Sequence, residues 1–170
     1  SVAEGAVYPG SLLEIAGRTD PFSTVWTHDP ATGALLTTTA DNFGRYSFGV
    51  LQFVEGPHSV TVDARDPAGN TASTTVHFTV DTTNFNNILT TGIFTSATID
   101  IVGNSKPDSQ VTMTHPITGA TLTTITSATG TYIFRSVNFI DGTYNITTTS
   151  EDTLGNLAVD SSTITIDSTV

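Results

Sequence analysis

The sequence predicts an all-β protein that contains two copies of one sandwich domain, and three observations support this. Thr occupies about a fifth of the 170 positions, and stiff β-branched side chains favour strands over helices. Short alternating apolar and polar runs are separated by turns rich in Gly, Pro, Asn and Asp, at the spacing of roughly 8–12 residues typical of such folds. The second half of the chain also repeats the first.

The repeat is the strongest signal in the sequence. Gly17 matches Gly103, and the same offset of 86 positions then holds without a gap. Residues 44–48 (GRYSF) match residues 130–134 (GTYIF) in this register. An ungapped match of this length indicates an internal duplication. The predicted domains span residues 1–82 and 83–170.

Each copy contains seven short segments with the alternation of a strand. In the first copy they are residues 6–8, 13–16, 24–28, 35–40, 45–48, 59–64 and 74–80. No window shows a helical period of useful length. Seven short strands in this order are typical of an immunoglobulin-like Greek-key β-sandwich. The predicted fold class is therefore two tandem sandwiches of this type, each with seven strands, whose cores include the recurring aromatic residues Tyr46, Phe48, Tyr132 and Phe134.

Composition excludes several classes of function. Sixteen Asp and Glu face five Lys and Arg, a formal net charge of −11, and no segment gathers several basic residues. We therefore expect no binding to nucleic acid and no insertion into a membrane. The chain has no Cys, which excludes disulfides and thiolate sites. The four His show no metal-ligand spacing, and no Ser–His–Asp arrangement recurs in both copies. We predict that the protein is not an enzyme.

The order of its short motifs resembles the bacterial immunoglobulin-like repeats of giant secreted surface adhesins and biofilm proteins. The first copy carries the motifs at residues 17–21 (GRTDP), 40–48 (ADNFGRYSF), 55–58 (EGPH), 66–70 (DPAGN) and 80–83 (VDTT). The second copy keeps this scaffold but has Lys106 in place of Asp20 and Ser127 in place of Asp41. The resemblance covers nearly the whole chain.

This resemblance implies a mechanical role. Such repeats form rods that project a terminal binding module from the bacterial cell surface, and calcium often binds at their junctions. We expect structural spacer repeats of an extracellular adhesin, secreted and monomeric, whose partners are neighbouring Ig-like repeats. The missing initiator Met and signal peptide predict an excerpt of a longer exported protein. Two alternatives remain open: an adhesion module that binds a glycan or protein of a host or matrix, and an accessory module of a carbohydrate enzyme or phage.

Acidic turn residues predict a calcium site at one end of the first copy. In an Ig sandwich the second–third, fourth–fifth and sixth–seventh strand connections share a pole, which places Asp20, Asp41 and Asp66 together. Carboxylate and carbonyl oxygens are the ligands that calcium prefers, at about 2.3–2.6 Å. The alternative is that these Asp residues accept hydrogen bonds from the backbone of their own turns. Both explanations remain open at this stage.

A second set of acids flanks the junction between the copies. The candidate ligands there are Glu55, Asp81 and Asp152, with Asp29, Asp108 and Glu151 nearby in the expected fold. Lys106 lies where the first copy has a carboxylate, so an ammonium group can replace the ion with a salt bridge. The linker at residues 82–87 (TTNFNN) lacks the Pro that the family shows after its Val-Asp-Thr-Thr motif. This absence argues against a stiff junction.

Trp26 is the only Trp in the chain. It alternates with Val25, so an inward Val25 predicts that Trp26 lies on the outer face of a sheet. An exposed aromatic ring can stack on a sugar or a protein partner. The alternative is that the ring packs flat over neighbouring Thr and Val side chains.

Overall fold

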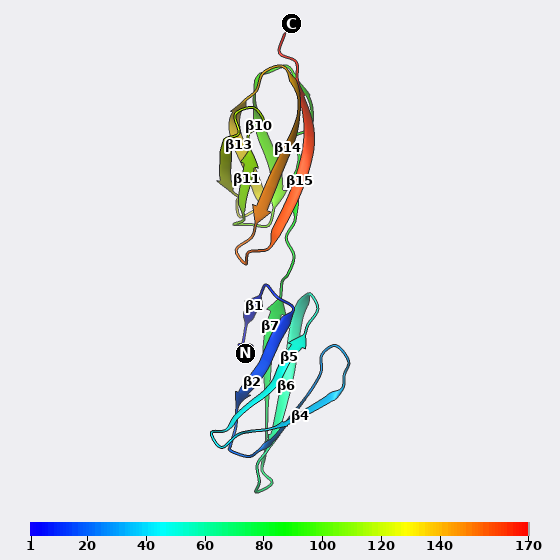
Figure 1. The fold of residues 1–170 in the computed structure, drawn as a ribbon, viewed down its shortest axis with the longest axis vertical. Helices are drawn as coiled ribbons and strands as arrows, with labels where there is room; N and C mark the ends of the chain where they lie inside the picture. The colour runs from blue at the N-terminus through cyan, green and yellow to red at the C-terminus, as the bar shows by residue number, and fades with distance from the viewer. Residues whose placement is uncertain (170) are drawn as a thin grey trace. The chain divides into compact units, whose positions relative to one another are not determined.

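A computed structural model of the chain describes residues 1–169, and these residues form strands and loops with no helix. The chain divides into two compact units, Ser1–Thr82 and Thr83–Val170, here named domain 1 and domain 2 (Figure 1). Each unit is a sandwich of two β-sheets. The predicted all-β, immunoglobulin-like fold class is confirmed.

Domain 1 has seven strands, as predicted. They are β1 (Ala6–Tyr8), β2 (Leu12–Arg18), β3 (Thr24–His28), β4 (Leu35–Thr39), β5 (Arg45–Gln52), β6 (Gly56–Arg65) and β7 (Thr71–Val80). One sheet has the order β1-β7-β6-β3-β4, and the other contains β2 and β5. Because β2 and β3 follow one another in sequence but lie in different sheets, the chain crosses the sandwich between them.

Domain 2 repeats this arrangement with one strand more. Its strands are β8 (Asn86–Ile88), β9 (Gly92–Phe94), β10 (Thr98–Ser105), β11 (Gln110–Thr114), β12 (Thr121–Ile125), β13 (Thr131–Asn138), β14 (Gly142–Glu151) and β15 (Leu157–Ile166). The sheets have the orders β12-β11-β14-β15-β9 and β13-β10-β8. The expectation of seven strands is therefore wrong for domain 2. The entering segment first pairs as β8 in one sheet and then crosses to pair as β9 in the other.

The alternation of residues along each strand determines which side chains enter the core. Val25 and its counterpart Val111 are fully buried, whereas Trp26 lies on the opposite face of β3 and is partly exposed. The turn before β5 needs a residue without a side chain, because a Cβ on Gly44 would lie 2.0 Å from the Thr19 carbonyl oxygen. Gly44 also has a φ of 73°, a conformation that other residues rarely adopt.

Each domain has its own hydrophobic core. In domain 1, Phe53 and Phe78 meet edge to face, with ring centroids 5.0 Å apart. In domain 2, Tyr132 and Phe134 are 1% and 5% exposed. Their counterparts in domain 1, Tyr46 and Phe48, are only half-buried. All four aromatic side chains pack in or against a core as predicted, but the two in domain 1 are more exposed than their counterparts, and one sheet of domain 1 is a strand narrower.

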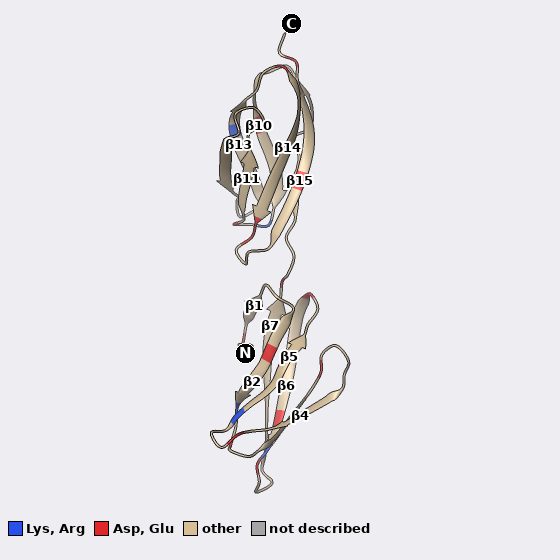
Figure 2. Cartoon of the chain, viewed as in Figure 1, with Lys and Arg blue, Asp and Glu red and all other residues tan. Residues whose placement is uncertain are grey.

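Charged residues are sparse on both domains. Figure 2 shows acidic positions scattered over strands and loops, with no continuous basic face among the described residues. The described residues also contain no helix long and apolar enough to cross a membrane.

The difference in burial predicts that removing equivalent aromatic side chains destabilises the two domains unequally. Phe134→Ala should cost about 3–5 kcal/mol of unfolding free energy, a typical loss for deleting a buried aromatic side chain. Phe48→Ala should cost clearly less, because water already reaches the side chain in the folded state. Denaturant unfolding followed by Trp26 fluorescence reports domain 1, and circular dichroism reports both domains. Equal losses for the two variants would contradict the difference in packing.

Candidate functional site

The three loops predicted to share a pole of domain 1 do lie together. The Thr19 amide donates to the Gly44 carbonyl at 2.8 Å, and the Phe22 amide donates to the Ala40 carbonyl at 3.2 Å. Asp20 and Asp66 line one shallow hollow at this pole. The topology therefore gathers the loops of the first acid set.

Two of the three carboxylates at this pole, those of Asp41 and Asp66, accept hydrogen bonds from their own turns. Asp41 Oδ1 accepts from the amides of Phe43 and Arg45, both at 2.8 Å. Asp66 accepts from the backbone and the side-chain amide of Asn70, both at 2.8 Å. The Arg45 amide lowers the pKa of Asp41, and the Asn70 side chain lowers that of Asp66. Each acid thus stabilises the turn that contains it.

Domain 2 keeps the acid at one equivalent position, where Asp152 corresponds to Asp66, and places other acceptors at the positions of Asp41 and Asp29. Ser127, the counterpart of Asp41, accepts from the amides of Thr129 and Thr131 at 3.3 and 3.2 Å. His115 replaces Asp29, and its Nδ1 accepts from the two amides that follow its turn, at 3.2 and 3.4 Å. Asp29 Oδ1 makes the same pair of bonds at 2.8 and 3.1 Å. The shared feature is an acceptor at a fixed place in the turn, whether or not it carries a charge.

As they lie, these acids do not form a donor set for calcium. Calcium takes six to eight oxygen ligands, whereas Asp41 Oδ1 already accepts two backbone hydrogen bonds. Across residues 1–169, no three or more His, Asp or Glu side chains are grouped so that they could hold a metal ion. In this geometry Asp41 and Asp66 stabilise their turns, and calcium binding stays a prediction.

The acids predicted near the junction fix the ends of strands. Glu55 Oε2 accepts from the backbone amide and hydroxyl of Thr82, at 2.8 and 2.7 Å. Asp141, the counterpart of Glu55, accepts from Ser168 in the same way, at 2.9 and 2.5 Å. The Asp81 amide donates to the Tyr8 carbonyl at 2.9 Å. In both domains a carboxylate thus holds the segment that leaves the last strand.

Lys106 makes the salt bridge expected at the first pole of domain 2. Its Nζ lies 3.2 Å from Asp152 Oδ2 and also donates to the Thr83 carbonyl. Burial raises the pKa of Asp152, but hydrogen bonds from Asn156 and Lys106 outweigh this and hold the pKa below its usual range. The other two acids proposed for this pole, Asp108 and Glu151, are exposed.

The linker enters domain 2 as part of its fold, which the sequence reasoning missed. The side-chain amide of Asn84 donates to the carbonyls of Ser150 and Asn156, at 3.2 and 3.1 Å. The side-chain amide of Asn86 donates to the carbonyl and hydroxyl of Thr148, at 2.9 and 2.8 Å. Inward residues at every second position were the signal in the sequence, since Asn84 and Asn86 are followed by the buried Ile88.

We name the groove that holds this segment the entry slot. In domain 2 it is lined by Gly103, Ser105, Tyr132, Thr148, Ser150, Asp152, Asn156 and Asp160. The Tyr132 hydroxyl lies 3.1 Å from Thr148 Oγ1 in the slot floor. Gly103 is required there, because a Cβ would lie 2.2 Å from the Tyr132 ring and 2.5 Å from the Asn87 carbonyl oxygen.

Trp26 is oriented as predicted, opposite Val25. It lines a hollow on the outer face of the large sheet of domain 1, together with Leu35, Arg65 and neighbouring strand residues. Leu35 is 61% exposed. This face thus presents an aromatic ring, an aliphatic side chain and a guanidinium group. A small ligand or a protein surface could contact all three.

Part of the chain resembles a known protein family in sequence. Residues 15–82 match the family model of the bacterial Ig-like domain. This match covers most of domain 1. Domain 2 has the same fold through the 86-residue repeat, and the reported match does not extend into it. The chain matches none of the curated proteins with which it was compared.

Solved structures with a similar fold include repeats of large proteins. One is a 1.5-MDa bacterial ice-binding adhesin, 18% identical, with a TM-score of 0.57 over 95% of this chain and 59% of that one. Another is a tetra-tandem repeat from the extending region of a large adhesion protein, 25% identical, with a TM-score of 0.44 over 94% of this chain and 46% of that one. The chain therefore spans about half the length of these structures.

Calcium binding at the first pole of domain 1 can be measured directly. If Asp20, Asp41 and Asp66 rearrange around an ion, calorimetric titration after chelation should show a saturable site, and calcium should raise the melting temperature of domain 1 by mass action. Asp66→Ala should remove both effects. Domain 2 is the internal control, since Lys106 and Ser127 replace two of the acids. No heat and no shift would leave turn stabilisation as the whole role of these acids.

Proposed function

We propose that the chain is a pair of spacer repeats from a bacterial cell-surface adhesin. Domain 2 is a small sandwich that the chain enters at one pole and leaves at the other, an arrangement that allows copies to be added end to end. In this role the domains set the distance between an anchor and a binding module, and they carry no reaction. Their partners are neighbouring repeats of the same chain, and their place is outside the cell.

The observation that carries this proposal is the duplication itself. The same capping bonds recur at both exits, where Thr82 donates to Glu55 and Ser168 donates to Asp141, although the side chains differ. Natural spacer arrays need domains that fold and connect alike, but need no common binding face. The outer faces indeed differ, because Trp26 in domain 1 corresponds to Thr112 in domain 2. The family match of domain 1 and the fold shared with a large bacterial adhesin support the same role.

A second candidate function is adhesion through domain 1. The hollow beside Trp26 supports it, with Leu35 and Arg65 on the same face. If domain 1 binds a glycan or protein through this hollow, domain 2 does not need the same hollow. This is a weaker basis than the duplication, because isolated apolar side chains are common on protein surfaces.

The spacer function predicts that reach depends on copy number. One, two or four copies of the 170-residue chain are fused between a cell-surface anchor and a reporter domain of known ligand. Adhesion to that ligand beneath a polymer layer should increase with the number of copies, because each copy adds length. Trp26→Ser in every copy should leave adhesion unchanged.

Controls separate the two functions. If the repeats act only as spacers, inactivating the binding site of the reporter domain should abolish adhesion. Adhesion that persists without the reporter, and that Trp26→Ser removes, would contradict the spacer function and favour the adhesion module.

A further inference from the structure

The first pole of domain 1 exposes two phenyl rings. This pole consists of the loops at residues 19–23, 40–44 and 66–70, which the bonds described above hold together. Phe22 and Phe43 are 63% and 67% exposed there. The equivalent positions in domain 2 hold Asp108 and Thr129, so the sandwich itself needs no ring at either. Both are exposed even though a linker precedes domain 2, and the exposure of these positions therefore does not depend on what lies in front of the domain.

The backbone of Phe22 is unusual for a residue of this type. Its φ of 62° lies in the left-handed region, which strains a bulky residue but suits Asp or Asn. Asp108 takes the same place in domain 2 with a φ of 58°. Domain 1 thus carries a residue that strains the backbone and leaves its ring in water. Strained residues of this kind are found at binding sites, where a partner gives them a role.

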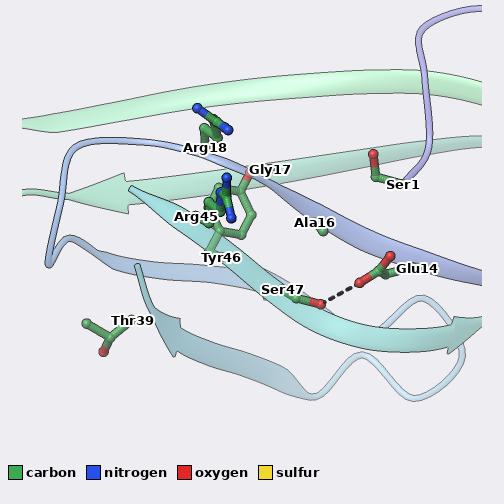
Figure 3. Close-up of a pocket in the computed structure, with 9 residues that line it drawn as sticks. All are labelled: Ser1, Glu14, Ala16, Gly17, Arg18, Thr39, Arg45, Tyr46 and Ser47. Carbon is green, nitrogen blue, oxygen red and sulfur yellow. Dashed lines mark hydrogen bonds between the residues drawn. The ribbon is translucent and has the colours of Figure 1, made fainter. Parts of the chain in front are cut away.

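Three guanidinium groups lie beside the same pole. Arg18 ends β2, Arg45 begins β5 and Arg65 ends β6, and all three residues are exposed. Arg18 and Arg45 are cross-strand partners (Figure 3). The guanidinium carbon of Arg45 lies 5.8 Å from the centroid of the Phe43 ring. At the three equivalent positions domain 2 has Asn104, Thr131 and Glu151. The combination of aromatic rings and Arg is therefore specific to domain 1.

The acids of this pole leave the guanidinium groups free to bind another molecule. Asp41 Oδ1 and both oxygens of Asp66 accept bonds within their own turns. The charges of Arg45 and Arg18 help to lower the pKa of Asp41, after the larger effect of the Arg45 amide. Among the described residues, however, no carboxylate forms an ion pair with a guanidinium group of this pole. Aromatic residues and Arg are the side chains most enriched at protein interfaces.

The exit pole of domain 2 presents two isoleucines. This pole consists of the loops at residues 115–120 and 139–141 and the segment at residues 167–169. His115 joins the two loops, since its Nε2 lies 2.8 Å from the Asn138 carbonyl oxygen and its Nδ1 accepts from the Ile117 amide at 3.2 Å. Ile117 and Ile140 are 44% and 68% exposed. The counterpart of Ile117 in domain 1 is Ala31, so this exit also carries an apolar side chain that the fold does not require.

The charge of the exit pole is opposite to that of the three guanidinium groups. Asp141 and Asp167 are both exposed there, and Asp141 is held in place by its bonds to Ser168. Figure 2 shows acidic positions and no basic position among the described residues at this end of domain 2. The two basic residues of domain 2 lie elsewhere, because Lys106 pairs with Asp152 at the other pole and Arg135 belongs to β13.

We infer that the first pole of domain 1 binds the exit pole of domain 2 of a second copy of this chain, head to tail. In this contact Phe22 and Phe43 pack on Ile117 and Ile140, and the guanidinium groups of domain 1 face the exit-pole carboxylates. An apolar centre with a charged rim is typical of specific interfaces, and opposite charges fix their orientation. Two exit poles would oppose acid to acid, which favours the head-to-tail order.

This association goes beyond the spacer function, because spacers set a distance whether or not their ends bind each other. A head-to-tail contact is heterologous, so each complex keeps one free pole of each kind and further copies can join. The contact is small and therefore weak, and the chain stays monomeric in dilute solution. Copies joined end to end hold such poles at an effective concentration on the order of millimolar, where a weak contact is enough to align them.

Sedimentation equilibrium of the intact chain tests this association, with chelator present so that calcium plays no part. The weight-average mass should rise toward about twice that of one chain near 1 mM, the range of weak contacts of this size. Raising the salt to about 0.5 M should reduce the rise, because salt screens the charges at the rim. Trp26→Ser removes an exposed aromatic ring outside both poles and should associate like the parent.

Two variants separate the two poles. The first-pole variant carries Phe22→Asp and Phe43→Thr, the residues that domain 2 has at these positions. Its melting temperature should not fall, because Asp relieves the backbone strain at position 22. The exit-pole variant carries Ile117→Ala and Ile140→Ser. Each variant alone should remain monomeric at every concentration, whereas an equal mixture should form a one-to-one complex and nothing larger, because each partner keeps one intact pole.

Three results would overturn the inference. One is a parent chain whose mass stays that of one chain throughout the concentration range. Another is a first-pole variant that associates as strongly as the parent, since the phenyl rings would then play no part. The third is an exit-pole variant that still forms dimers by itself, because two first poles would then bind each other and the contact would not run head to tail. None of these results bears on the spacer function, which the fusion experiment tests separately.

Discussion

The backbone amides at the poles of each sandwich must find acceptors, and this constraint organises much of the molecule. Strand ladders satisfy the amides within the sheets, but the chain reverses at each pole, where unpaired amides are costly to bury. Here side chains supply the missing acceptors at fixed positions in the turns. Asp41 accepts two amides in one domain and Ser127 accepts two in the other. Among the acids, Asp29, Asp66 and Asp152 accept turn amides in the same way.

The same constraint extends to the linker. Between Thr82 and Gly92 the chain could have crossed open solvent, yet its amides and side-chain amides bond to domain 2. The Ile88 amide donates to Asp160 at 2.8 Å, and the Leu89 amide donates to the Val102 carbonyl at 2.8 Å. The linker is thus partly a strand of the domain that it enters. The fold of domain 2 therefore includes the linker residues that precede its large sheet.

Sequence reasoning reached the fold class and most strands, because alternation and turn residues are local signals. Residues 24–28 were predicted as a strand and are β3, and Val25 is buried as expected. It failed for β8 because three residues within a Thr- and Asn-rich linker carry too little pattern, and Asn there reads as a turn residue. It overestimated the burial of Tyr46, since burial depends on a neighbouring strand that no local pattern reveals. The shared pole of Asp20, Asp41 and Asp66 followed from topology, whereas the direction of each carboxylate depended on hydrogen bonds within its turn.

The turns require an acceptor at these positions and not a charge. The most direct measurement compares Asp41→Ser with Asp41→Ala by denaturant unfolding of the intact chain in calcium-free buffer, followed by Trp26 fluorescence. Because Ser127 makes both bonds in domain 2, Asp41→Ser should unfold at nearly the same denaturant concentration as the parent, whereas Asp41→Ala should unfold at a clearly lower one, as when a capping side chain is removed. Equal losses for the two variants would contradict the claim, because they would show that the negative charge of Asp41 is what stabilises the pole.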